Sequence, residues 1–170
     1  RRNRDEPQVV ATLKGHTEVL WSVSPLPGRR LASCSDDGTV KVWDLSNLDD
    51  PQCETTLNGH ASCVHAVTPL PGGWLASCSR DRTVKVWDPR KRDGKQCVAT
   101  LKGHTDVVWS VSPLPDGLLL ASCSYDGTVK VWDLSNLDDP QCVATLKGHT
   151  DVVWSVSPLP GRRLASCSDD

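Results

Sequence analysis

Short apolar or alternating runs, separated by turn signals, recur along the whole chain. In the clearest stretch, Leu101–Asp133, the runs are Val107–Val111, Leu118–Cys123 and Thr128–Trp132. Pro115-Asp116-Gly117 separates the first two runs, and Asp126-Gly127 separates the last two. Runs of this length joined by tight turns are typical of antiparallel strands. The pattern therefore predicts a meander of three short strands.

The same unit occurs four times at a nearly constant spacing. A Gly-His pair opens each copy, with the histidines 44, 44 and 45 residues apart, at His16, His60, His104 and His149. A Trp-Asp pair closes three of the copies, at Trp43, Trp87 and Trp132. A further apolar run precedes each Gly-His pair, at Val9–Leu13, Cys53–Leu57, Cys97–Leu101 and Cys142–Leu146. Self-similarity at this period indicates a solenoid, a propeller or an array in which each unit covers its neighbour.

We expect each unit to add one outer strand and three meander strands. In the first unit the meander strands are predicted at Val19–Ser24, Leu31–Ser35 and Thr39–Trp43. The fourth unit offers Val152–Ser157 and Leu164–Ser168, and Asp170 comes before a third strand and its tryptophan. Repeat boundaries fall at about 8–51, 52–95, 96–140 and 141–170, all within one domain, 1–170. The polar residues 1–7 are predicted to form a loop.

These residues resemble the WD40 repeat family, whose signature is a Gly-His pair, a Ser-x-Asp-x-Thr turn and a Trp-Asp pair at a period of roughly 40–45 residues. The resemblance implies an all-β fold, a β-propeller with one four-stranded antiparallel blade per repeat. Four repeats leave the ring incomplete, so the remaining blades are expected from missing sequence or from a second copy. Ala99–Pro115 and Ala144–Pro160 are identical. Such near-identical copies resemble the arrays of NACHT- or NB-ARC-type signalling NTPases, although this chain contains no P-loop.

Composition narrows the classes of partner and cofactor. The net charge of −2 gives no basic field for nucleic acid, and no apolar run is long enough to cross a bilayer. Seven of the eight cysteines follow the repeat, Cys63 is the exception, and no Cys-x-x-Cys pair is present. We therefore predict reduced thiols in an intracellular, cytoplasmic protein without metal or cofactor, rather than disulfides.

Each repeat offers a serine, a histidine and an aspartate, which together suggest either a hydrolytic triad or a structural set. A catalytic triad is needed once, whereas this set returns with the period of the fold, so we expect no enzyme. The family resemblance implies hydrogen-bonded structural tetrads that include the strand tryptophan. The sets are His16, Ser33, Asp37 and Trp43; His60, Ser77, Asp81 and Trp87; His104, Ser122, Asp126 and Trp132; and His149, Ser166 and Asp170.

The resemblance also places partner contacts on the top rim, at the third and fifth residues after the histidine and at the residue before the turn aspartate. The predicted partner-binding residues are Trp21, Asp36, His65, Arg80, Trp109, Tyr125, Trp154 and Asp169. Val19, Cys63, Val107 and Val152 occupy the remaining rim positions. Large aromatic and arginine side chains are typical of binding hot spots. The tryptophans among them fit a buried blade core equally well.

The second repeat differs most from the others, because His65 replaces a tryptophan and Arg82 replaces a glycine. Its loop after the Trp-Asp pair is basic, whereas the matching loops carry Asp49-Asp50 and Asp138-Asp139. The predicted function is a non-catalytic scaffold or sensor that binds proteins or peptides. Trp87-Asp88-Pro89-Arg90 also matches the WDxR motif of cullin-RING substrate receptors, which gives an alternative role as a ubiquitin-ligase subunit.

Overall fold

The computed structural model describes residues 8–170, and these residues form an almost purely β structure with a single 3-10 turn, η1 (Pro71–Gly73). The predicted loop at residues 1–7 lies outside the described residues. The strands are β1 (Leu20–Leu26), β2 (Arg30–Ser35), β3 (Val40–Asp44), β4 (Gln52–Leu57), β5 (Val64–Leu70), β6 (Trp74–Ser79), β7 (Thr83–Trp87), β8 (Cys97–Lys102), β9 (Val108–Pro113), β10 (Leu119–Ser124), β11 (Val129–Asp133), β12 (Gln141–Leu146), β13 (Val153–Leu159) and β14 (Arg163–Ser168).

The strands form antiparallel sheets in which sequence neighbours pair. β1–β4, β5–β8 and β9–β12 each make a four-stranded sheet, and β13 pairs with β14 alone. Register follows the repeat, since Ser33 lies opposite Lys41 in the first sheet and Ser122 opposite Lys130 in the third. The predicted all-β fold of repeated antiparallel meanders is confirmed, with two strands in the fourth sheet.

The outer strand predicted at Val9–Leu13 is wrong, because residues 8–17 have no regular structure. In the other repeats this run pairs with the third strand of the preceding repeat, as Val129 on β11 pairs with Leu146 on β12. No third strand precedes Val9 among the described residues, so the backbone of this run has no ladder to join. Its side chains stay in solvent, with Val9 87% and Val10 70% exposed.

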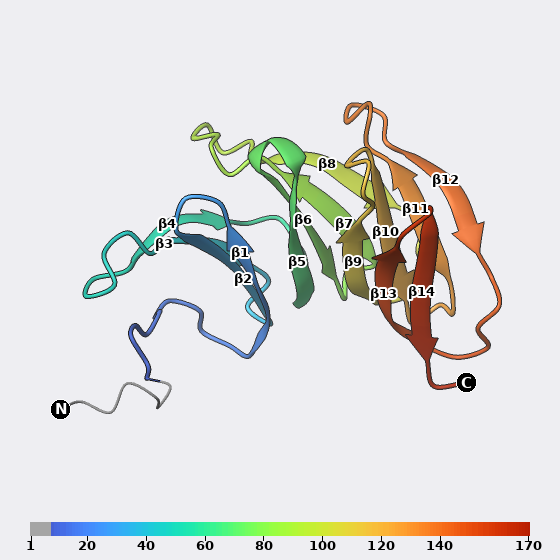
Figure 1. The fold of residues 1–170 in the computed structure, drawn as a ribbon, viewed down its shortest axis with the longest axis horizontal. Helices are drawn as coiled ribbons and strands as arrows, with labels where there is room; N and C mark the ends of the chain where they lie inside the picture. Colours follow the sequence, from blue (N-terminus) through green and yellow to red (C-terminus); the bar gives the residue numbers. More distant parts are fainter. Residues whose placement is uncertain (1–7) are drawn as a thin grey trace.

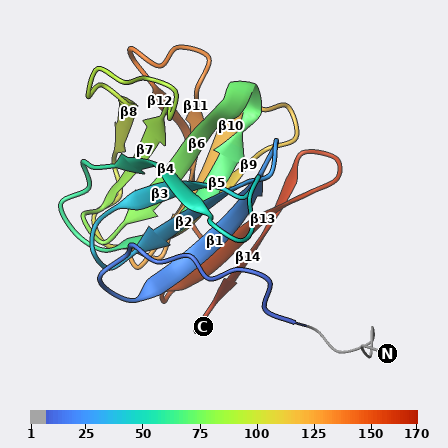
Figure 2. The ribbon, with the colours of Figure 1, turned by 90° about the vertical axis from the view of Figure 1, so that its left-hand side faces the viewer.

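The four sheets follow one another along an arc in chain order (Figure 1). The innermost strands β1, β5, β9 and β13 lie side by side in that order. Seen from the N-terminal side, the first sheet lies in front of the others (Figure 2). Among the described residues the ring is not closed, and the outward face of β1 is uncovered, with Leu20 53% and Val23 59% exposed.

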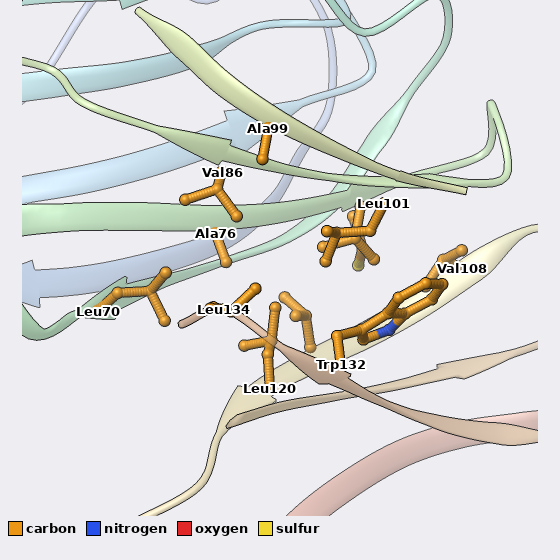
Figure 3. Packing of buried hydrophobic residues seen from close by; sticks show 12 residues of the cluster. Leu70, Ala76, Val86, Ala99, Leu101, Val108, Leu120, Trp132 and Leu134 are labelled. Atoms are coloured by element: carbon orange, nitrogen blue, oxygen red, sulfur yellow. The ribbon is translucent and has the colours of Figure 1, made fainter. Parts of the chain in front are cut away.

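The core lies between successive sheets rather than within any one of them. Between the second and third sheets, Leu101, Leu120 and Trp132 belong to one buried cluster (Figure 3). A similar cluster around Leu75 and Trp87 joins the first and second sheets. Successive side chains of a strand point to opposite faces, so each sheet presents an apolar surface on both sides. Each sheet is therefore stable only when neighbouring sheets cover these surfaces. The array thereby holds the loops at both ends of its strands in fixed positions.

The turn between β6 and β7 carries an arginine where the matching turns of the first and third sheets have glycine. In the turn between the second and third strands of a sheet, Gly38 and Gly127 have φ of 79° and 76°, and Arg82 has φ of 70° at the matching position. This left-handed region suits glycine, whereas a residue with a Cβ is strained there.

We expect Arg82→Gly to raise the free energy of unfolding by about 1 kcal/mol because it removes this strain. Urea denaturation of the purified chain measures the change. The reciprocal variant, Gly127→Arg, should lower the stability by a similar amount. A less stable Arg82→Gly variant would contradict the account of the turn.

Candidate protein-interaction site

A chain of hydrogen bonds ties the rim loops of the third repeat to its core. Trp132 Nε1 donates to Ser122 Oγ at 2.8 Å, and Ser122 Oγ lies 2.8 Å from His104 Nε2. His104 Nδ1 lies 2.8 Å from Asp126 Oδ2. Because the indole can only donate, the consistent arrangement has the serine hydroxyl donating to His104 Nε2 and the Nδ1–H donating to the carboxylate. Thr128 Oγ1 closes the chain by donating to Asp126 Oδ1 at 2.6 Å.

The same geometry recurs in the other repeats. His16 lies 2.7 Å from Asp37 and 2.8 Å from Ser33, to which Trp43 donates. His60, Asp81, Ser77 and Trp87 repeat these contacts in the second sheet. In the fourth repeat, His149 contacts Asp170 at 2.9 Å and Ser166 at 2.8 Å, and the set lies nearer to solvent.

The electrostatics favour ionised aspartates in these sets and a neutral imidazole at the buried His104. Burial raises the pKa of the Asp37 carboxyl, but hydrogen bonds from Thr39 and His16 outweigh it and bring the pKa to about 2. For His104, burial dominates and lowers the pKa below its usual value despite the contact with Asp126. The pair is therefore a neutral imidazole N–H donating to a carboxylate. Ser122 is completely buried, so its hydroxyl is not placed to attack a substrate.

The inner strands carry a row of aromatic rings at one matching position. The His65 and Trp109 rings stack with centroids 4.2 Å apart and planes 16° apart. Trp21 meets both rings edge-on, at 5.3 Å from His65 and 6.1 Å from Trp109. Trp154 extends the row, with its centroid 4.9 Å from that of Trp109. Edge-on and stacked contacts hold these rings in fixed orientations.

The row forms one wall of a pocket of about 300 Å³ where the first three repeats meet. Its lining residues are Trp21, Asp36, Cys63, His65, Arg80, Val107, Trp109 and Tyr125. Trp21 is 48% and Tyr125 51% exposed, so the mouth of the pocket presents large aromatic surface to solvent. The pocket thus combines apolar walls with a few polar groups, as binding sites commonly do.

Charged groups of both signs meet in this pocket. A hydrogen bond from the Trp21 indole N–H and a second one from Cys63 lower the pKa of Asp36 below its usual value. Burial lowers the pKa of His65, so this ring is neutral near pH 7. Arg80 is exposed and lies close enough to influence both groups. Its guanidinium has no carboxylate within salt-bridge distance among the described residues, and it remains available for a ligand.

The structure brings six of the eight predicted rim residues into the pocket lining and leaves two outside. Trp154 contacts Trp109 but lies beyond the lining, and Asp169 is an exposed residue near the C-terminal end of the arc. Cys63 and Val107 line the pocket as well, although residue type alone gave no reason to favour them. Val152 is buried against its neighbours.

A second hollow, on the opposite ends of the strands, was not predicted. Trp74 is among its lining residues, at the position where the first and fourth repeats have Arg30 and Arg163. That departure from the repeat is the signal that could have located it. The WDxR arginine also borders this hollow, where Arg90 Nε donates to Asp88 Oδ1 at 2.8 Å.

Residues 8–170 contain neither a metal-binding cluster nor a membrane-spanning helix. No group of three or more histidine, cysteine, aspartate or glutamate side chains is arranged to hold a metal ion in this part of the chain. No helix among these residues is long and apolar enough to cross a membrane.

Comparison with known proteins agrees with the repeat geometry. The family model described as WD40, "WD domain, G-beta repeat", matches residues 7–44, 51–88, 95–133 and 140–170. The chain is also similar to striatin-4 of Homo sapiens and of Mus musculus, at 46% identity over 44 residues in each case. That segment is 25% of this chain and 6% of the length of striatin-4, so the likeness covers one repeat's worth of sequence.

Proposed function

The chain belongs to the WD40 family of WD-domain, G-beta repeats, and on that premise we propose that it is a non-catalytic scaffold or sensor that binds a peptide segment of a partner protein in the rim pocket. WD40 repeats indicate a protein-interaction scaffold. The pocket of about 300 Å³ is the observation that carries the finer proposal, because it gathers Trp21, Trp109 and Tyr125 around two charged side chains. Rigid aromatic side chains give a large contact area at low entropic cost.

The chemistry of the second repeat favours an acidic or phosphorylated peptide. Arg80 is exposed at the pocket, and Arg82 is exposed on the same turn. A guanidinium binds carboxylate and phosphate through paired hydrogen bonds. Asp36 lies beside Arg80 and limits how much negative charge the pocket accepts on the first-repeat side. We therefore place the anionic group over the second repeat and an apolar side chain against the rings.

The hydrogen-bonded Ser-His-Asp sets support the non-catalytic part of the proposal. In three repeats the serine hydroxyl accepts a tryptophan N–H and is buried, which leaves no accessible nucleophile in these three sets. Their role is to satisfy the polar groups of the rim loops and to hold those loops on the strands. The alternative role as a ubiquitin-ligase subunit depends on Trp87–Arg90, and we propose it no further because Arg90 is bonded to the neighbouring Asp88.

We expect the double variant Arg80→Ala with Tyr125→Ala to weaken peptide binding by about tenfold or more, since it removes the anion-binding group and one ring. The probe is an array of nine-residue peptides with central phosphoserine, glutamate, serine or lysine, and fluorescence anisotropy measures the affinities. The parent should prefer the phosphoserine and glutamate peptides.

The matched control is Arg29→Ala with Asp138→Ala, two exposed positions in loops at the other ends of the strands. This pair should leave the affinities unchanged. If the rim pair binds every peptide like the parent and the control pair abolishes binding, the partner does not occupy the rim pocket.

A further inference from the structure

A groove of about 390 Å³ lies between the second and third sheets, at the ends of the strands away from the rim pocket. It is lined by Leu70, Pro71, Gly72, Trp74, Arg90, Gly117, Leu118 and Leu134. The short helix η1, drawn as the green coil near the top of the second sheet in Figure 1, contributes two of these residues. Its lining comes from strand ends and from connecting loops of the second and third sheets, both of which have four strands.

Trp74 stands at a position where the first and fourth repeats have arginine. In the first and fourth repeats, the Nε of Arg30 and of Arg163 donates to the carbonyl of Pro27 and of Pro160 in the adjoining turn. Trp74 makes no such bond and packs, partly buried, against the cluster that contains Leu70 and Leu134. An apolar surface therefore stands where the first and fourth repeats carry a guanidinium.

Leu118 forms the opposite lip and is held outward by its own turn. Its side chain is 56% exposed. Asp116 Oδ1 accepts the backbone N–H groups of Leu118 and Leu119, and Leu134 N donates to the Leu118 carbonyl at 2.8 Å. A large apolar side chain on a turn fixed in this way is preorganised for contact, so a partner would not have to order it on binding.

Arg90 is the one charged residue in the lining, and its orientation is fixed. Its Nε and Nη2 donate to the Asp88 carboxylate at 2.8 and 3.2 Å. The third nitrogen, Nη1, lies beside Gly73 at the edge of the groove. Lys91 and Lys95 follow on the same loop, are exposed and form no ion pair with the described residues. The charge at this end of the groove is therefore positive and complements a carboxylate.

We propose that this groove is a second protein-interaction surface, and that it takes a partner segment presenting a large apolar side chain next to acidic residues. The apolar side chain lies on Trp74 against Leu118, and the acidic residues face Arg90 and Lys91. The matching loops of the first and third repeats have serine in place of Arg90 and carry aspartates. Their negative charge therefore repels the acidic residues of such a segment. The second repeat thus has an interaction surface that its sister repeats lack.

Two capped peptides of opposite charge test the ligand chemistry. The acidic probe is acetyl-Glu-Glu-Phe-Leu-Glu-Glu-amide, and the basic probe is acetyl-Lys-Lys-Phe-Leu-Lys-Lys-amide. Nuclear magnetic resonance of the ¹⁵N-labelled chain follows the indole N–H signal of Trp74. We expect the acidic peptide to shift this signal saturably and the basic peptide to leave it in place. Equal shifts by both peptides, or no shift by either, would overturn the proposal.

Three variants locate the binding. Trp74→Arg and Arg90→Ser install the residues of sister repeats and should weaken the acidic peptide about tenfold and about fivefold, respectively. Because Trp74→Arg lacks the indole signal, the affinities of all variants are measured by fluorescence anisotropy of the labelled acidic peptide. Leu118→Ser changes an exposed side chain, so it leaves the fold unperturbed, and it should weaken binding about fivefold. The rim variant Arg80→Ala with Tyr125→Ala should bind like the parent, which separates this surface from the rim pocket. Unchanged binding in Leu118→Ser, or loss of binding in the rim variant, would refute the groove as the site.

Discussion

Trp132→Ala is expected to lower the free energy of unfolding by about 3–5 kcal/mol, the largest effect of any single substitution considered for this protein. The indole is 2% exposed and packs in the cluster between the second and third sheets (Figure 3). Its ring edge approaches Gly103 so closely that a Cβ there would lie 3.2 Å from the ring. Truncation leaves a cavity on one side and removes the N–H that Ser122 accepts.

Urea denaturation of the parent and of the variant measures this loss. Trp154→Ala is the matched control, since the same side chain is deleted where it is 39% exposed, and the expected cost is about 1 kcal/mol. Trp132→Phe should recover part of the loss because it refills most of the cavity. Equal costs for Trp132→Ala and Trp154→Ala would show that the cluster between the sheets does not dominate stability.

His104→Ala is expected to cost about 1–3 kcal/mol, because it leaves the buried Ser122 hydroxyl and the Asp126 carboxylate without their shared partner. The loss should also change how stability depends on pH. Burial lowers the pKa of His104 in the folded chain, so the unfolded chain binds its proton first as the pH falls. The stability contributed by the neutral ring is therefore complete above the unfolded pKa of about 6.5 and is lost as the pH falls through the lowered folded value.

Denaturation at pH 7.5 and pH 5.0 separates this contribution from the rest. The parent should lose more stability than His104→Ala between the two values, because only the parent carries the titrating ring. The Asp126 carboxyl acts in the same direction at lower pH: burial raises its pKa, but bonds from Thr128, Thr105 and His104 outweigh this and lower it overall. Parallel pH profiles for parent and variant would contradict a neutral, buried His104.

Repeated motifs made much of the fold predictable. Gly-His marks a fixed point of all four repeats, Trp-Asp of three and the Asp-Gly turn of two. The apolar runs between these motifs became strands within a residue or two of the expected bounds. The same periodicity predicted which histidine, serine and aspartate lie together, because the fold brings equivalent positions to equivalent places. The contact geometry of these residues is now known, while partner binding at the rim stays a prediction.

The features that could not be predicted depend on neighbours rather than on local pattern. Val9–Leu13 has the composition of the other outer strands, yet a strand also needs a paired backbone. Trp154 matches Trp109 in sequence, but it lies outside the pocket because the lining comes from the first three repeats. The groove at Trp74 required knowledge of which loops of adjacent sheets meet. In each case the residue type was visible in the sequence and its environment was not.

The near-identity of the copies has a consequence for how the chain reaches this structure. Residues 97–102 and 142–147 have the same sequence, and each serves as the outer strand for a nearly identical third strand, β7 or β11. Exchanging the two partners would preserve every local backbone and side-chain contact of the ladder. Only the longer loop that the wrong pairing must close disfavours it, and loop-closure entropy grows slowly with length, by about 0.6 kcal/mol per doubling. Because near-identical strands can replace one another, we expect kinetic traps in which a strand pairs with the wrong repeat. In concentrated solution, we also expect strands to be exchanged between molecules.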